Sequence, residues 1–482
     1  MPYVAGGSTF GASYDVQDLQ VVQYTPPREL YLTLVPNSLT QLQLRGSGLF
    51  VELSAFLSSS SFLLRSETLF FDLQDLAFVI GFAIRAGAGN RAAVVITECG
   101  FSYGSIDVSR GSLSGSRIVS SIVNGIVERK LRSFFDGKVC DILQNEGSAK
   151  LTEWIARVPG EVNLFERQRR HYREKRAPMR FTTLSRDKLA EQLLSLASKL
   201  SLDLHIVGNP QVLSAGTSAF LEIPLSGQVR IRDVPSVPFY PKPMPPVRTN
   251  QYHHFYLIIS EFTLNSMLYQ MYANDLMNTV IEGSRSSSEM KEFLQTSCGG
   301  GRCIGTLFPS AFSGVKQQYL QMRVFPHTCP MVKIQGSKGI LIELALIVQF
   351  YSQPPKRKML YSLNLHGSGR LIIQSKLDRI TGKYTSLDMQ FQHKDKTNSD
   401  VWDLLSDVAS AAIEAKVNEI FERGFRIPSL GIGRLKNLKI QTDNNVIWIG
   451  VNLIFDTAVI QRAVSNLVQN KMAVSSPSAY YY

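Results

Sequence analysis

The feature that most constrains this chain is an order of elements that occurs twice along its 482 residues. In each half, segments with an apolar residue at every second position come first, one long amphipathic helix follows, and alternating segments return. Alternation with period two is typical of strands with one buried face, and apolar stripes at helical spacing are typical of a helix on a core. The order predicts a structural repeat of two α+β domains; the alternative is two unrelated α+β domains.

The first half contains the alternating segments and then the helix. Its alternating residues are Leu30, Leu32, Leu34, Leu42, Leu44, Phe78, Ile80, Phe82 and Ile84. In the segment 116–139, one row of apolar residues recurs every four positions through Val119, Val123 and Val127. A neighbouring row consists of Ile118, Ile122 and Ile126. This spacing predicts a long helix with a wide apolar face.

The second half repeats the pattern. Its alternating residues are Ile340, Ile342, Leu344, Leu346, Val348, Phe350, Leu387, Met389 and Phe391. A helix is predicted over 399–425, with one apolar face formed by Leu405, Val408, Ala412, Ile413, Val417, Ile420 and Phe421. Two further strands follow, joined through the turn-like cluster from Thr442 to Asn445.

A proline-rich segment separates the two halves. Residues 231–249 read IRDVPSVPFYPKPMPPVRT, with six prolines between Pro235 and Pro246. Proline lacks the amide donor and fixes φ, so this segment is neither a helix nor a central strand. We interpret it as a semi-rigid linker.

Charge is concentrated in one short segment. The chain carries a net charge of +12, and the stretch 167–176 holds six basic residues against one acid, Glu174. The basic residues are Arg167, Arg169, Arg170, Arg173, Lys175 and Arg176. The remainder is only mildly basic, which argues against a broad nucleic-acid surface. The segment is interpreted as a solvated loop, a patch that attracts anionic lipid surfaces, or a site cleaved after Arg176.

No catalytic or metal-binding motif is present in the sequence. It has no Gly-x-Ser-x-Gly elbow, no phosphate-binding GxxxxGK[ST] loop, no HExxH and no Cys-x-x-Cys pair. We therefore predict a protein that is not an enzyme and has no metal site or cofactor. No apolar run has the ~20 residues that a transmembrane helix needs, and the start lacks the features of a signal peptide.

Five cysteines stand at positions 99, 140, 298, 303 and 329. In the second half, a disulfide between Cys298 and Cys303 would close the Gly-rich stretch CGGGRC; a bridge from either of them to Cys329 is the alternative. One thiol remains unpaired in either case.

The stretch CGFSYGSIDVSRGSLSGSRIVSSIVNGIVERKLRSFFDGKVCDIL, from Cys99 to Leu143, resembles the disulfide-bearing segment of one family of lipid-binding proteins. That family contains the bactericidal/permeability-increasing, lipopolysaccharide-binding and cholesteryl ester transfer proteins. The proline-rich centre with HHFYLIISEFTLNSMLYQMY, and the ending ERGFRIPSLGIGRLKNLKIQTDNNVIWIGVNLIF, are also similar to it. The resemblance spans about residues 10–456.

The resemblance implies an α+β fold of two tandem, pseudo-repeated, twisted antiparallel β-barrels. Each barrel wraps around a long helix, in an elongated boomerang with a central sheet. The implied domains are an N-terminal lipid-binding barrel (1–230), the linker (231–249), a C-terminal lipid-binding barrel (250–460) and a tail (461–482). The first barrel would lack the family's first helix and would carry a basic insertion at about 165–200.

The resemblance also implies a Cys99–Cys140 disulfide, and with it secretion into an oxidising compartment. Its functional implication is an extracellular protein that holds or transfers phospholipid or another acyl lipid, with an innate-immune role. The residues predicted to line the lipid pockets are Ile118, Ile122, Val123, Ile126, Phe262, Met267, Leu268, Met271, Val408 and Ala412.

Two further expectations concern partners. Lipids and membrane surfaces are the expected partners, and nucleic acid is not. Lipopolysaccharide recognition needs clustered cations, whereas the hairpin that carries lysines in the antibacterial members holds only Arg65 here. The rival interpretation is a non-catalytic interaction protein that uses the tubular fold as a scaffold and the loop 167–176 to dock an anionic surface or partner.

Overall fold

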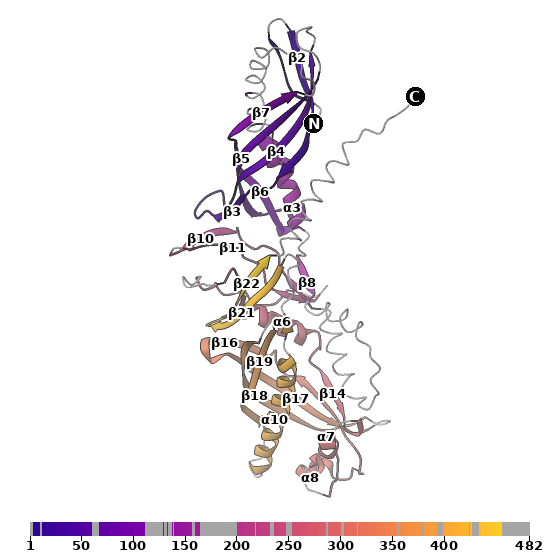
Figure 1. Ribbon diagram of the computed structural model, residues 1–482. Helices are drawn as coiled ribbons and strands as arrows, with labels where there is room; N and C mark the ends of the chain where they lie inside the picture. The colour runs from indigo at the N-terminus through magenta and orange to yellow at the C-terminus, as the bar shows by residue number, and fades with distance from the viewer. Residues whose placement is uncertain are drawn as a thin grey trace, which may run out of the picture. The chain divides into compact units, whose positions relative to one another are not determined.

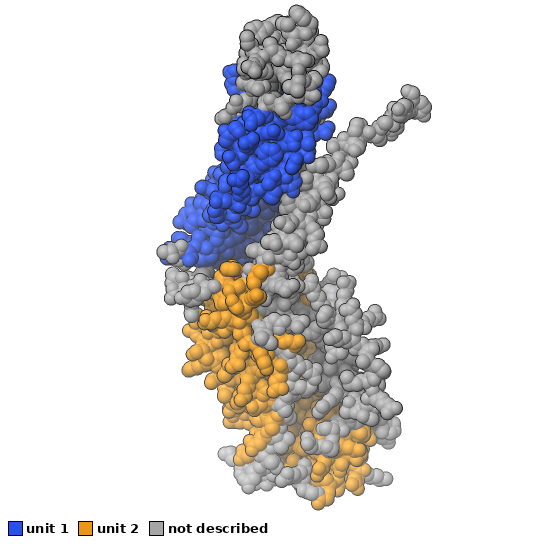
Figure 2. All heavy atoms as spheres, viewed as in Figure 1, with its two compact units in different colours: residues 1–160, 204–226, 247–249 blue, residues 161–203, 227–246, 250–482 orange. Residues whose placement is uncertain are grey.

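Two curled antiparallel sheets, each of seven strands, organise the part of the chain that the computed structural model describes. The described residues are 3–9, 12–59, 67–110, 129, 133, 137, 139–156, 160–163, 200–216, 218–231, 236–246, 253–285, 288–299, 303–315, 317–353, 357–376, 379–392, 399–423, 425–426 and 433–455. By contacts the chain divides into two units (Figure 2), and each is described by itself. Unit 1 comprises 1–160, 204–226 and 247–249; unit 2 comprises 161–203, 227–246 and 250–482.

Unit 1 contains the first seven-stranded sheet. Its strands are β1 (Tyr3–Thr9), β2 (Ala12–Thr25), β3 (Glu29–Leu34), β4 (Leu42–Ser59), β5 (Glu67–Ala86), β6 (Ala92–Ser102) and β7 (Ser105–Arg110). They pair in the order β1-β2-β4-β5-β6, with β3 also on β4 and β7 also on β5. The short helix η1 (Ala88–Asn90) precedes β6, and β10 (Gln211–Ala215) and β11 (Ser218–Glu222) form a separate hairpin.

A continuous helical run follows the first sheet. It consists of α2 (Cys140–Ile142), η3 (Leu143–Gly147) and α3 (Ser148–Ile155). The predicted disulfide is confirmed, because Cys99 of β6 and Cys140 at the start of this run are bonded with their Cα atoms 5.6 Å apart. The predicted helix over 116–139 lies almost entirely outside the described residues.

Unit 2 contains the second large sheet. Its strands are β14 (Thr279–Glu282), β15 (Gln321–Pro326), β16 (Met331–Ile334), β17 (Ile340–Tyr351), β18 (Met359–Lys376), β19 (Arg379–Gln392) and β20 (Phe425–Arg426). They pair in the order β14-β15-β17-β18-β19-β20, with β16 also on β17. The two large sheets therefore share a pattern. In the first sheet β2 and the short β3 pair with the same edge of β4, and in the second β15 and the short β16 pair with the same edge of β17.

Two smaller sheets complete unit 2. One pairs β12 (Val229–Ile231), β9 (Leu200–Asp203) and β8 (Glu161–Asn163), and the other pairs β13 (Phe255–Ser260), β22 (Val446–Phe455) and β21 (Gly433–Asp443). The predicted turn joins β21 to β22, and Asn445 there has a φ of 66°, which asparagine tolerates well.

Two long helices of unit 2 cover its strands, α6 (Glu261–Ala273) and α10 (Ser399–Arg423) (Figure 1). The predicted helix over 399–425 is confirmed as α10. The shorter helices are η4 (Gly283–Arg285), α7 (Ser288–Phe293), α8 (Ile304–Leu307), α9 (Pro309–Phe312) and η5 (Gly336–Lys338).

The alternating segments all form strands, but the predicted buried face is wrong in places. Leu30 and Leu32 of β3 are 57% and 59% exposed. Among the described strands β3 pairs with β4 alone, so it is an edge strand. The alternation of apolar residues predicts a strand, but it does not show whether the apolar face of an edge strand is covered. In β5, Phe78 and Ile80 are only half-buried, whereas Ala83 on the opposite face is fully buried.

Leu387 is a second correction, because it is exposed whereas Met389 is buried. The pairing of β18 with β19 shifts at this place: Gly369 faces Ser386 and Ser368 faces Asp388. Leu387 is therefore the extra residue of a β-bulge, which interrupts the alternation of side chains. Ile340, Val348 and Phe350 of β17 are buried as predicted.

Candidate functional site

The apolar interior of unit 2 lies between its two long helices and its sheets. One cluster gathers around Val332, Ile334 and Ile340, with Ile447 and Ile449 of β22. Leu264 and Leu268 of α6, and Ile413, Val417 and Phe421 of α10, pack against it. Both helices therefore contribute apolar side chains to the same cluster.

A second cluster lies further along α10. Trp402 and Leu405 near the start of α10 pack there with Phe308, Phe312 and Leu363. The Trp402 ring lies 5.1 Å from the Phe308 ring and 6.2 Å from the Phe391 ring, measured between centroids. Helix α10 thus spans two apolar clusters with different residues, and Val408 and Ala412 stand between them in sequence. Their backbone is part of α10, and their side chains lie outside the described residues.

The predicted residues on α6 fall on different faces. Leu268 packs on the apolar cluster of α6 and α10. Phe262 instead contacts Phe239 of the proline-rich segment edge to face, with the ring centroids 5.9 Å apart. Met267 and Met271 are half-buried. Leu268 thus packs on the same cluster as Ile413 and Val417 of α10, whereas Phe262 contacts the proline-rich segment.

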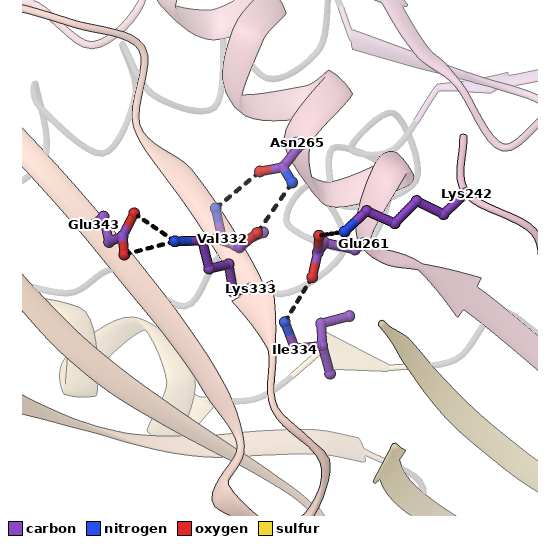
Figure 3. A network of polar contacts seen from close by, with 7 residues as sticks. All are labelled: Lys242, Glu261, Asn265, Val332, Lys333, Ile334 and Glu343. Carbon is purple, nitrogen blue, oxygen red and sulfur yellow. Dashed lines mark hydrogen bonds and ion pairs between the residues drawn. The ribbon is translucent and has the colours of Figure 1, made fainter. Parts of the chain in front are cut away.

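Helix α6 also holds the free edge of β16 through two side chains, as Figure 3 shows. The amide of Asn265 donates to the carbonyl of Val332 at 3.0 Å and accepts from its N–H at 2.8 Å. One turn earlier, Glu261 accepts from the N–H of Ile334 at 2.9 Å. We call this kind of contact an edge clip. In an edge clip, two helix side chains four residues apart bind the backbone of two strand residues that are two apart on a strand edge.

Helix α10 makes the same contact with β19. Asn418 accepts from the N–H of Tyr384 at 2.6 Å and donates to its carbonyl at 2.9 Å. Four residues earlier, Glu414 accepts from the N–H of Ser386 at 3.4 Å. Both clips therefore use a Glu followed by an Asn, to residues two apart on the strand.

Unit 1 has a third edge clip, made by hydroxyl groups. Ser148 of α3 accepts from the N–H of Ile96, and Thr152 accepts from the N–H of Val94, both at 2.9 Å. Four helical residues rise about 6 Å and two strand residues about 6.6 Å, so the two spacings match. A helix can therefore satisfy backbone groups that another strand would otherwise bind.

Sequence reasoning missed the edge clips. Their only signal is a polar pair four residues apart on an otherwise apolar helix face, as in EFTLN and EAKVN. Such a pair is ordinarily interpreted as solvated surface.

Burial changes the acid–base chemistry of Tyr384, which lies 1% exposed beneath α10. Loss of hydration raises the pKa of its phenol above the ordinary value, the polar Ser386 side chain works against that rise, and the nearby Glu414 carboxylate adds to it. Tyr384 is therefore neutral at physiological pH and forms part of the apolar wall.

Several predicted features lie outside the described residues. These are the predicted lining residues Ile118, Ile122, Val123 and Ile126 and the basic residues Arg167, Arg169, Arg170, Arg173, Lys175 and Arg176.

The remaining cysteines follow one of the two predicted pairings. Cys298 and Cys303 are bonded, with Cα atoms 6.0 Å apart, and Cys329 is a free thiol whose pKa is raised by burial. In the described part of the chain, no three His, Cys, Asp or Glu residues stand close enough to hold a metal ion. No helix among the described residues combines the length and apolarity that crossing a membrane requires.

Comparison with solved structures returns distant likenesses. The chain is similar to a lipopolysaccharide binding protein at 15% identity, over 94% of this chain and 92% of that one, with a TM-score of 0.49. It is also similar to P47 of Clostridium botulinum E1 at 11% identity (89% and 94% covered, TM-score 0.29). For Takeout 1 of Epiphyas postvittana the identity is 10% (32% and 77% covered, TM-score 0.21). No curated protein sequence matches.

The family comparison is more informative, because it rests on sequence. The family model described as "LBP / BPI / CETP family, C-terminal domain" matches residues 195–455. That range includes α6, α10 and every strand of the second large sheet. It also covers more than half of the 482 residues. The chain therefore belongs to the LBP/BPI/CETP family of lipid-binding proteins.

Proposed function

We propose that this protein binds an acyl lipid in the apolar interior of unit 2 and carries it between membranes. The observation that supports this most directly is that α6 and α10 both turn apolar side chains toward the concentration of Ile and Val residues on the strands. Membership of a family of lipid-binding proteins supports the same conclusion. Burial of one methylene is worth ~0.8 kcal/mol against water, so a two-chain lipid would be held firmly in solution.

The acyl chains would run along α10 between its two apolar clusters. Val408 and Ala412 stand on α10 between Leu405 of one cluster and Ile413 of the other, which supports their proposed role in lining the pocket. Leu268 is proposed to line it from α6. Met267 and Met271 have unbranched side chains that adapt to irregular ligands, which suits the same role.

The finer proposals concern the ligand and the compartment. We infer a phospholipid or another acyl lipid as the ligand, and an extracellular role that includes innate immunity. The Cys99–Cys140 and Cys298–Cys303 disulfides support secretion, because disulfides persist in oxidising compartments.

Native mass spectrometry with organic extraction tests the proposal. We expect the purified chain to release stoichiometric phospholipid or neutral lipid. Ala412→Trp should fill the pocket and lower the bound lipid at least several-fold, because an indole occupies space that the acyl chains need. The matched control is Ala411→Trp, since Ala411 is the exposed neighbour on the same helix. A folded Ala412→Trp variant that retains its full lipid content would contradict this placement, and a folded wild-type chain without lipid would contradict the function.

A further inference from the structure

An open pocket of about 640 Å³ lies where the start of α6 meets two loops of unit 2. Its lining holds three lysines against one glutamate, together with three side-chain amides. The lining residues are Lys242, Glu261, Lys333, Ile334, Gln335, Lys338, Asn444 and Asn445. The surplus of ammonium and amide donors is the chemistry that binds phosphate oxygens.

The walls of this pocket are joined by two backbone hydrogen bonds and by one from a side-chain hydroxyl. Asn445 of the β21–β22 turn donates to the carbonyl of Ile334 at 3.1 Å, and its carbonyl accepts from the N–H of Glu261 at 2.8 Å. Thr442 donates to the carbonyl of Gly336 at 2.7 Å. The start of α6, the end of β16 with η5, and the turn are therefore held in place before any ligand binds.

The single carboxylate of the pocket is already engaged. Glu261 accepts from Lys242 through Oε1 at 3.2 Å and from the N–H of Ile334 through Oε2 at 2.9 Å (Figure 3). Lys333 pairs with Glu343 at 3.0 Å. Lys338 has no carboxylate partner within the described residues, so its ammonium is available to an anion.

The proline-rich segment adds apolar side chains beside the pocket. We call residues 236–246 the proline strap. It is fastened to α6 by Phe239, whose ring meets Phe262 and Tyr269, and three residues later by the Lys242–Glu261 ion pair. A spacing of three places side chains on one face of an extended proline-rich chain. The neighbouring apolar side chains of the strap are accessible, because Tyr240 is 93% exposed and Met244 is 45% exposed.

We propose that the pocket and the proline strap form a docking surface for phospholipid membranes, in which Lys338 binds a headgroup phosphate and Tyr240 and Met244 enter the interface. Tyrosine favours the boundary between headgroups and acyl chains, because its ring is apolar and its hydroxyl is polar. The prolines restrict the strap before docking, so that little chain entropy is lost. This inference rests on the proposed function, because a lipid carrier has to bind a membrane to exchange its lipid.

Vesicle flotation of the full chain tests this docking surface. The vesicles contain phosphatidylcholine with or without phosphatidic acid. Lys338→Glu exchanges attraction for repulsion at an anionic surface, so it should weaken binding to the phosphatidic acid vesicles roughly 25-fold. Tyr240→Ser should weaken binding several-fold on its own.

The matched control is Lys358→Glu. Lys358 is an exposed lysine that precedes β18, and residue 371 near the pocket lies about 40 Å further along that strand. At that distance salt screens the charge, so binding should stay within about twofold of wild type. Equal losses in Lys358→Glu and Lys338→Glu, or no loss in Lys338→Glu, would overturn the proposal.

Two additional measurements separate the alternatives. The lipid content of Lys338→Glu, measured by native mass spectrometry, should equal that of wild type, because docking and lipid storage use different residues. A chain that carries no lipid yet docks would contradict the proposed function and leave the docking surface intact. If Lys338→Glu abolishes the binding of inorganic phosphate in a titration but leaves vesicle binding unchanged, the pocket binds soluble phosphate and the membrane proposal fails.

Discussion

Tyr384 of β19 contacts the neighbouring strand, helix α10 and the apolar cluster of unit 2. Its phenol packs over Gly369 on the neighbouring strand, where an added Cβ would collide with the ring. Its backbone is bound by Asn418, and its ring belongs to the cluster that α6 and α10 share. The position therefore needs a small residue opposite it and a helix beside it.

The raised pKa of Tyr384 predicts a pH dependence of stability. In the unfolded chain the phenol loses its proton near pH 10, and in the folded chain it does so at higher pH. The free energy of unfolding should therefore be independent of this group below about pH 10 and should fall as the pH rises above it. Urea unfolding of wild type and Tyr384→Phe across this range measures the effect, and parallel curves for the two proteins would contradict it.

Edge clips are the main feature at the scale of elements. In each clip a helix satisfies backbone groups on a stretch of strand edge that no described strand pairs with, which removes a site for unwanted pairing. Strand β3, the counterpart of β16 in its pairing, exposes Leu30, Tyr31 and Leu32 instead.

Asn418→Ala tests the clip on β19. The variant leaves the N–H and carbonyl of Tyr384 without their partner, which should lower the free energy of unfolding by about 2–4 kcal/mol. Hydrogen exchange should show faster exchange of the Tyr384 amide. Glu422→Ala, at an exposed position of the same helix, is the control and should have little effect. Unchanged protection of the Tyr384 amide would contradict the role of Asn418.

The difference in burial between Leu32 of β3 and Leu73 of β5 gives another prediction for stability. Leu32→Ser should change the free energy of unfolding by no more than about 0.5 kcal/mol, because Leu32 is exposed. Leu73→Ala on β5 should cost about 2–5 kcal/mol, because Leu73 is fully buried. Chemical denaturation of both variants tests the corrected assignment, and similar losses would refute it.

These elements also show how far the sequence leads. Helix α10 could be predicted from the sequence, because its apolar residues from Leu405 to Phe421 repeat at helical spacing. The position of Leu387 in a bulge was not, because a bulge depends on how β18 pairs with β19. Glu261 and Asn265 were overlooked since their partners, Ile334 and Val332, are about 70 residues away and only folding brings them together.

At the scale of the molecule, covalent links and chain topology set the stability of each unit. Cys99–Cys140 spans 41 residues and joins the first sheet to the helical run, whereas Cys298–Cys303 spans five. In the chain-entropy model, the longer loop stabilises by about 4 kcal/mol and the shorter by about 2 kcal/mol.

Removal of each disulfide should therefore have unequal effects. The Cys99→Ala/Cys140→Ala variant should unfold at a clearly lower temperature in the transition of unit 1. The Cys298→Ala/Cys303→Ala variant should show a smaller shift in the transition of unit 2. Cys329→Ala is the control, because it changes a cysteine that forms no disulfide. Scanning calorimetry separates the two transitions, and a larger shift for the short loop would contradict the ranking.

The pairing of β13 with β22 has a consequence for biosynthesis. Phe255 faces Val451, so the strand that opens this part of unit 2 finds its partner only 196 residues later. Translation proceeds at ~5–20 residues per second, so β13 waits on the order of ten seconds or more for β22 to be made. Until then Ile258 and its neighbours have no strand beside them. A nascent chain at this stage is the form of the protein that chaperones would meet.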